Sequence, residues 1–195
     1  MAMPSPAPAR RRWTLAEVRA LIDAAPGTVP RYELVDGELL VTPSPAGPHG
    51  FAVHELGLAL GNWLRDTPVG AVLESQFDVE LEPETLVQPD VFVVPPDEAK
   101  RLRHEMPARK LTLVIEVLSP SSARFDRGEK RKLYQRHVPE YWIVDLDARL
   151  FERWRPGAPH PEILHDTIDW RPQGTSAAFE LSLPEFFARV FDEPI

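Results

Sequence analysis

The segment LVIEVLSP, residues 113–120, places one glutamate inside an otherwise apolar run. The apolar residues around Glu116 are typical of a strand that is buried on both faces of a sheet. A carboxylate in such a strand costs several kcal/mol to desolvate unless a cation or hydrogen bonds compensate it. The sequence therefore predicts a buried strand here and a partner for Glu116 elsewhere in the chain.

Composition limits the class of protein. The 195 residues are 43% hydrophobic, enough for one domain, which we expect over residues 13–195 after a disordered tail at residues 1–12. The sequence has no cysteine and no run of roughly 18 apolar residues, so we expect a cytoplasmic protein with no membrane partner. A net charge of −8 argues against sequence-independent coating of nucleic acid.

The order of predicted elements is that of an α/β domain with a mixed sheet. Hydrophobic spacing and capping signals predict helices at residues 14–23, 51–64, 125–137 and from 183 onward. Strands are predicted at 31–35, 38–42, 70–81, 91–95, around Glu116, at 141–145, and in one or two further segments, 149–154 and 161–165. Asp36-Gly37 predicts a hairpin between the first two strands. The basic stretch 100–110 is predicted to be an exposed loop.

Asp90 is the first candidate to share a site with Glu116. Pro89 ends a loop, and Asp90 opens the apolar segment VFVV. Two carboxylates in one site cannot both ionise cheaply, so either one pKa rises or a cation lies between them. Mg²⁺ or Mn²⁺ would suit such oxygen ligands. The alternative is that Asp90 is a turn residue that caps the start of its strand.

The second candidate partner is a lysine, and helical phase selects Lys130. At about 100° per residue, one face of helix 125–137 collects Asp126, Lys130, Leu133, Tyr134 and His137. Its apolar members indicate that this face meets the sheet, whereas Lys132 points away. A lysine delivered there can stabilise negative charge on a phosphate or position a water. The alternative is a buried ion pair between Lys130 and Glu116 without a chemical role.

These residues carry a family resemblance. Asp90 after proline, Glu116 and a nearby lysine resemble the PD-(D/E)XK nuclease superfamily, whose αβββαβ core holds a metal between an aspartate and a glutamate. The segments YELVDGEL, PHG, QPDVFVV, IEVLSPSS, DRGEK and VPEYWIVD, in this order, are similar to the Uma-type family of putative restriction endonucleases. The superfamily lysine would stand at Leu118, but the Uma-type pattern places it in the next helix, where Lys130 matches.

The resemblance implies a restriction-endonuclease-like core, with an N-terminal helix and β-hairpin before it and C-terminal β additions. Four residues are candidates for supporting roles. Tyr134 shares the face of Lys130, although a tyrosine there is more often a core residue, and Asp126 is an i,i+4 partner for the lysine. His49 points inward at a helix start, where it caps the helix or serves the site. Glu33 recurs in the family resemblance as a third carboxylate.

We therefore expect a Mg²⁺-dependent endonuclease acting on DNA, with RNA as the other candidate. Asp90 and Glu116, with the Val117 carbonyl, would hold the ion, and Lys130 would orient a water or stabilise the transition state. Basic residues of the loop could contact phosphates: Arg101, Arg103, Arg109 and Lys110. The rivals are a catalytically inactive module that binds nucleic acid or a partner protein, and a hydrolase of small phosphorylated substrates. A homodimer would follow from two-ended cutting by analogy.

Overall fold

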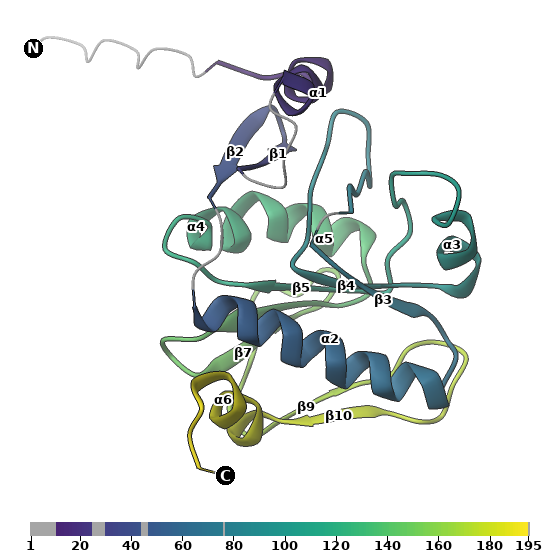
Figure 1. Ribbon diagram of the computed structural model, residues 1–195, viewed down its shortest axis with the longest axis vertical. Helices are drawn as coiled ribbons and strands as arrows, with labels where there is room; N and C mark the ends of the chain where they lie inside the picture. Colours follow the sequence, from purple (N-terminus) through teal and green to yellow (C-terminus); the bar gives the residue numbers. More distant parts are fainter. Residues whose placement is uncertain (1–10, 25–29, 44–46, 76, 195) are drawn as a thin grey trace, which may run out of the picture.

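The computed structural model of the protein describes residues 11–24, 30–43, 47–75 and 77–194 (Figure 1). Within these residues the central element is a six-stranded mixed sheet of order β3-β4-β5-β6-β7-β8. The strands are β3 (Ala71–Glu74), β4 (Val91–Val94), β5 (Leu113–Val117), β6 (Tyr141–Asp145), β7 (Leu150–Trp154) and β8 (Glu162–Leu164). β5 and β6 pair in parallel and the other neighbours are antiparallel. The predicted mixed α/β fold is confirmed.

Both faces of the sheet are covered, which explains why every residue of β4 and β5 is buried. One face carries α4 (Ala123–Phe125), a π-helical turn η1 (Asp126–Lys130) and α5 (Arg131–His137). The other face carries α2 (Pro48–Asp66), α6 (Leu183–Phe191) and the hairpin of β9 (Thr167–Trp170) and β10 (Phe179–Ser182) (Figure 1). The sheet is thus the middle layer between two sets of helices.

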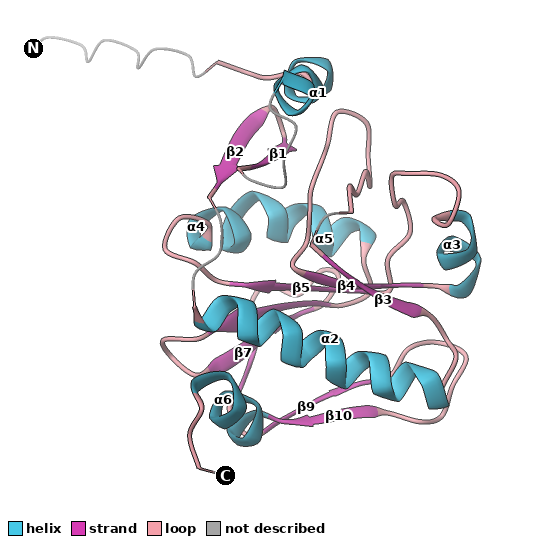
Figure 2. Ribbon diagram, viewed as in Figure 1, coloured by secondary structure: helices cyan, strands magenta, loops and turns pink. Residues whose placement is uncertain are grey.

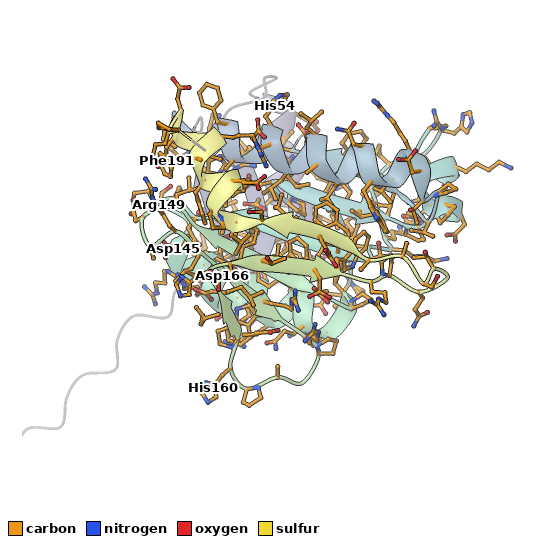
Figure 3. The ribbon with its side chains drawn as sticks, turned by 90° about the horizontal axis from the view of Figure 1, so that it is seen from below. His54, Asp145, Arg149, His160, Asp166 and Phe191 are labelled. Carbon is orange, nitrogen blue, oxygen red and sulfur yellow. The ribbon has the colours of Figure 1, made fainter. Side chains whose placement is uncertain are left out.

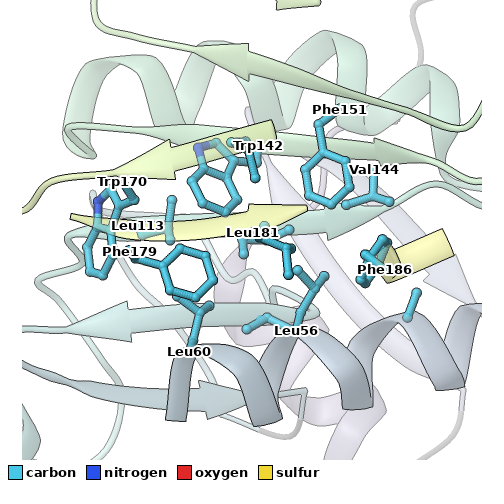
Figure 4. Close-up of a cluster of buried hydrophobic side chains, with 14 of the residues drawn as sticks. Leu56, Leu60, Leu113, Trp142, Val144, Phe151, Trp170, Phe179, Leu181 and Phe186 are labelled. Atoms are coloured by element: carbon cyan, nitrogen blue, oxygen red, sulfur yellow. The ribbon is translucent and has the colours of Figure 1, made fainter. Parts of the chain in front are cut away.

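The core on the α2 side is rich in aromatic side chains (Figure 4). Trp142 from β6 lies with its ring centroid 6.2 Å from Phe151 of β7 and 6.4 Å from Phe179 of β10. Leu56 and Leu60, one turn apart on α2, are fully buried against the same cluster. This packing fixes α2, whose first turn carries His49.

The N-terminal helix and hairpin form what we call the N-terminal cap: α1 (Leu15–Ala24), β1 (Arg31–Val35) and β2 (Glu38–Thr42). The cap lies on the side of α4 and α5 (Figure 2). A capping box opens α1, since the Thr14 N–H donates to Glu17 Oε2 at 2.9 Å. Asp36 and Gly37 both have positive φ, 49° and 74°, as a two-residue hairpin turn of this type requires.

Side chains alternate along β1 between two environments. Tyr32 and Leu34 pack towards α1, whereas Arg31 and Glu33 make ion pairs with residues of the central sheet and its helix. The backbone of Leu34 also exchanges hydrogen bonds with Leu86, which ties the cap to the rest of the molecule. The cap therefore presents two charged side chains to the sheet.

Several predicted elements need correction. The strand predicted over 70–81 ends at Glu74, because Val79 pairs instead with Val87 and Ala108 outside the sheet. The basic stretch 100–110 is not simply an exposed loop: α3 (Pro96–Arg101) reaches into it, and Pro107 and Ala108 are buried.

Three further features depart from the sequence patterns. The short hairpin β9–β10 was not predicted, and the helix predicted over 125–137 contains a π-helical turn. His137, placed by helical phase on the inward face, is exposed and contacts Glu82 instead.

The predicted tail at residues 1–12 lies outside the described residues except for Arg11 and Arg12. In the described part of the chain, no helix is long and apolar enough to span a membrane.

Candidate active site

The two predicted carboxylates lie side by side on one face of the sheet. Val91 pairs with Ile115 in the antiparallel β4–β5 ladder, so Asp90 and Glu116 occupy neighbouring positions that point the same way. The Asp90 N–H donates to Glu116 Oε2 at 3.4 Å, and the Val117 N–H donates to Asp90 Oδ2 at 3.0 Å. Both side chains are buried. The fold therefore buries two neighbouring acids, and the carboxylate of each accepts a hydrogen bond from the backbone at or beside the other.

Lys130 reaches the same place from the π-helical turn that follows β5. Its Nζ lies 2.9 Å from Glu116 Oε1, 2.8 Å from Glu33 Oε1 and 3.5 Å from Asp126 Oδ1. The contact to Asp126 is an ion pair without a hydrogen bond. π-Helical turns are rare in proteins, and those that do occur frequently lie at functional sites. Lys130 is thus a buried cation with three carboxylates around it.

Tyr134 and His49 each hold one of the two central acids. The Tyr134 hydroxyl donates to Glu116 Oε1 at 3.0 Å, and Tyr134 is completely buried. His49 Nε2 lies 3.2 Å from Asp90 Oδ2, while its buried Nδ1 has no hydrogen-bond partner. Tyr134 and His49, two of the four residues that were predicted to support the site, therefore contact it directly.

The N-terminal cap contributes two residues, of which the family resemblance indicated one. Glu33 accepts a hydrogen bond from the Gln88 N–H at 2.8 Å in addition to its contact with Lys130. Arg31 was not predicted, yet its Nη1 lies 3.0 Å from Asp90 Oδ1. The signal that could have found it is strand alternation, because Arg31 stands two residues before Glu33 and so shares its face.

The pKa values follow from burial among like charges. Burial raises the pKa of Glu116 well above its ordinary value, and although Lys130 opposes the shift, the neighbouring acids add to it. Burial likewise raises the pKa of Asp126 to about 6 against the effect of Lys130. Asp90 differs: burial would raise its pKa, but His49, Arg31 and Lys130 outweigh this and bring it to about 2.

The balance of charge explains these opposite shifts. The cluster contains four buried carboxylates, Glu33, Asp90, Glu116 and Asp126, against the two permanent cations Arg31 and Lys130. Around Lys130 the carboxylates raise the pKa of the amine well above its ordinary value despite burial. The cluster therefore has fewer cations than acids, and the pKa values of Glu116 and Asp126, which share Lys130 with Glu33, are the ones that rise.

A cavity of about 550 Å³ opens beside Asp90. Arg31 and His49 line this cavity and also contact Asp90. Asp90 therefore lies directly behind the cavity wall. Asp145 and Phe191, labelled in Figure 3, lie on other parts of the lining. The lining residues are Arg31, Thr42, Pro43, Pro48, His49, Leu118, Ser119, Pro120, Ser121, Ala123, Arg127, Asp145, Leu146, Asp147 and Phe191. The cavity is thus the route by which a ligand could approach the acids.

The donor set suits a hard divalent ion, but its oxygens are already engaged. Asp90 and Glu116 supply the carboxylate oxygens that Mg²⁺ and Mn²⁺ prefer. Among the described residues, no three histidine, aspartate or glutamate side chains are placed to hold a metal as they stand. An ion at Asp90 Oδ1 would have to replace the Arg31 guanidinium. The chemistry fits, with movement of Arg31 as the condition.

The basic stretch that was considered for phosphate contacts does not adjoin the site. Asp90 precedes β4 at one end, whereas α3 and the stretch after it follow the other end of this strand. Four residues of strand separate the two by about 13 Å. Arg101 is moreover engaged by Glu98, whose Oε1 lies 2.6 Å from Arg101 Nη2. The cations that flank the acids are instead Arg31 and Lys130.

The mixed sheet, its buried acid pair and the lysine from the following helix define a restriction-endonuclease-like α/β protein. A family model for Uma2, described as "Putative restriction endonuclease", matches residues 16–189, and the chain belongs to this family. A solved structure from Anabaena variabilis ATCC 29413, described as a "putative nuclease belonging to DUF820", superposes with a TM-score of 0.73 at 19% identity. That match covers 91% of this chain and 99% of the other. No curated protein matches the chain.

Proposed function

We propose that the protein is a metal-dependent nuclease that hydrolyses phosphodiester bonds in DNA. The observation that carries the proposal is the charge of the buried cluster. Four carboxylates face two permanent cations, which leaves a formal charge of −2 when all four acids are ionised and His49 is neutral. One divalent cation would balance this charge, in a setting where isolated charges are costly to bury.

Each residue of the site would have a separate role in binding the ion or the water. Asp90 and Glu116, with the Val117 carbonyl, would hold Mg²⁺ or Mn²⁺, which would neutralise negative charge that develops on the phosphate. Lys130 would orient the attacking water or stabilise the transition state. Its contacts with Glu33 and Asp126 hold the amine in place, because both carboxylates lie within 3.5 Å of Nζ. Tyr134 fixes the Glu116 carboxylate through its hydroxyl.

DNA as substrate is supported by the family description. The whole chain has a net charge of −8, so phosphates would need a local group of cations. Arg31 and Arg127 line the cavity and could contact phosphates, although Arg127 also pairs with Asp145 and Glu152. Phosphates bound there would lie next to the acids that hold the ion.

The first experiment is Mn²⁺ binding, measured by EPR or titration calorimetry, because it needs no assumption about the substrate. Wild-type protein should bind Mn²⁺, and Asp90→Asn should weaken this binding. Glu140→Gln is the matched control: Glu140 is also a buried acid, but its partners are Arg153 and Trp142 on the far side of the sheet. Equal Mn²⁺ binding by all three proteins would argue against the proposed site.

One observation favours a second candidate, a non-catalytic module that binds nucleic acid or a partner protein. Both central acids already have internal partners at hydrogen-bonding distance, Arg31 on Asp90 and Lys130 on Glu116. A module that had lost metal binding would be stabilised by such pairs. Absence of Mn²⁺ binding at millimolar metal, with and without DNA, would support this candidate and contradict the nuclease.

A further inference from the structure

We propose that Arg31 exchanges between two anions: it holds Asp90 before metal binds, and it holds a phosphate of the nucleic-acid strand once the ion has taken its place. The inference rests on the proposed function, because it concerns the same acids and the same substrate class. It assigns to the N-terminal cap a direct role in substrate binding. It also explains how a site with fully engaged carboxylates can accept a metal.

At Asp90, an incoming metal ion can compete for one carboxylate oxygen, Oδ1. Oδ2 accepts from the Val117 N–H at 3.0 Å and lies 3.2 Å from His49 Nε2. Oδ1 is held by Arg31 Nη1 at 3.0 Å. A guanidinium and a divalent ion repel one another strongly in a buried site, so they cannot both occupy Oδ1. Metal binding must therefore displace the Arg31 side chain from Asp90.

Arg31 has both the unused donors and the position for a second anion. Its Nε is buried without a hydrogen-bond partner, and besides Asp90 its guanidinium reaches only the Gln88 carbonyl, at 3.4 Å, among the described residues. Its side chain is 12% exposed, and the residue lines the cavity. The fork of an arginine matches two phosphate oxygens better than the one carboxylate oxygen it holds here.

The backbone of Arg31 is fixed while the side chain moves. β1 pairs with β2 along its whole length, and Arg31 itself pairs with Thr42, which also lines the cavity. A released guanidinium therefore stays next to the ion that displaced it. Binding of the metal and binding of the phosphate must then strengthen one another, since coupling between two sites is reciprocal.

The decisive experiment compares Mn²⁺ affinity, by EPR titration without nucleic acid, in wild type, Arg31→Ala and Arg19→Ala. Removing the competing cation should tighten Mn²⁺ binding by roughly fivefold or more, the usual range for coupled sites. A merely structural role for Arg31 would weaken it. Arg19→Ala is the matched control, because Arg19 lies in the same cap and pairs with Glu80 away from the acids. It should leave Mn²⁺ affinity unchanged.

The second measurement is the salt dependence of binding to a labelled single-stranded oligonucleotide in Ca²⁺, by fluorescence anisotropy. Arg31→Ala should bind the strand more weakly and should lower the slope of log K against log salt by about 0.7, the value for one phosphate contact on a single strand. Arg31→Lys should restore most of the slope. Arg31→Gln, which removes the charge but keeps a polar side chain, gives the same expectations as alanine and serves if Arg31→Ala does not fold.

The outcomes separate this inference from the proposed function. If wild type shows no Asp90-dependent Mn²⁺ binding, the proposed function fails, and the exchange fails with it. If wild type binds Mn²⁺ and the neutral Arg31 variants bind it no more tightly, the exchange is overturned while the nuclease proposal stands. An unchanged salt slope in those variants would equally overturn the phosphate contact.

Discussion

Lys130 Nζ lies 2.8 Å from Glu33 Oε1, although one residue comes from the helix after β5 and the other from the N-terminal cap. The same amine contacts Glu116 of the central sheet at 2.9 Å. Lys130 therefore joins three separate segments at one point. Loss of this amine should affect stability as well as any chemistry, and the two effects can be separated.

Lys130→Met should destabilise the fold by about 3–5 kcal/mol, because it leaves buried carboxylates without their shared cation. The measurement is urea unfolding at neutral pH, with the m-value checked for two-state behaviour. Lys132→Met is the control, since the side chain of Lys132 is 53% exposed and should contribute within about 0.5 kcal/mol. Equal stability of the two variants would show that the Lys130 contacts carry no net energy.

Glu116→Gln should remove metal-dependent cleavage and leave the fold intact. The amide keeps the shape of the side chain and can still accept from Tyr134, whose hydroxyl lies 3.0 Å from Oε1. It removes a charge whose burial is costly, as the raised pKa of Glu116 shows. The variant should therefore unfold at a temperature close to that of wild type while its cleavage of plasmid DNA in Mn²⁺ is lost. Full cleavage by this variant would contradict the proposed mechanism.

Single-stranded DNA should compete for the site better than a blunt duplex of the same sequence. The cavity of about 550 Å³ is in the range that holds one small ligand, so it can admit an unpaired nucleotide but not a double helix. The acids behind it are buried, and Asp90 is only 2% exposed. Competition against a labelled oligonucleotide, followed by anisotropy in Ca²⁺, measures this preference. Tighter binding of the intact duplex would show that the cavity opens much further than its present shape.

Glu98→Gln should reduce the loss of stability in acid. The Arg101 guanidinium holds the pKa of Glu98 below its ordinary value of 4.5, and the Arg109 N–H adds to this while burial opposes it. As the pH falls, the unfolded chain takes up this proton first, so the stabilisation is present above pH 4.5 and is lost through the lower folded pKa.

The test is the free energy of unfolding between neutral pH and acid. The wild-type curve should fall more steeply below pH 4.5 than that of Glu98→Gln. Glu105→Gln is the control: Glu105 also contacts Arg101, at 3.4 Å, but its side chain is 68% exposed. Its curve should follow wild type. Parallel curves for all three proteins would mean that Glu98 does not contribute to acid sensitivity.

Much of the site could be predicted because strand and helix periodicity act locally. The continuous apolar run of β5 predicted the burial of Glu116, and helical phase selected Lys130 over Lys132. The phase also placed Tyr134 correctly, although the helix contains a π-helical turn. These assignments depend only on residues that are close in the chain.

What could not be predicted depends on contacts between distant segments. Arg31 looks like an ordinary strand residue until the cap folds onto the sheet and brings it to Asp90. The end of β3 at Glu74 reflects the pairing of Val79 with Val87 and Ala108, which competes with continuation of the sheet. The pairing of short strands such as β9 depends on the aromatic core, where the ring centroid of Trp170 lies 5.7 Å from that of Trp63 in α2.

The parallel pairing of β5 and β6 has a consequence for how the molecule acquires its site. The helical segment that carries Lys130 is also the crossover that returns the chain from β5 to β6. Parallel strands can be joined only by such a crossover, and their pairing has to wait for its closure. Until Tyr141 has come to lie opposite Val114, the amine has no fixed place beside the acids. A chain in which this pair has not formed thus holds all the residues of the site but not their arrangement, and competence for binding requires the β5–β6 pairing.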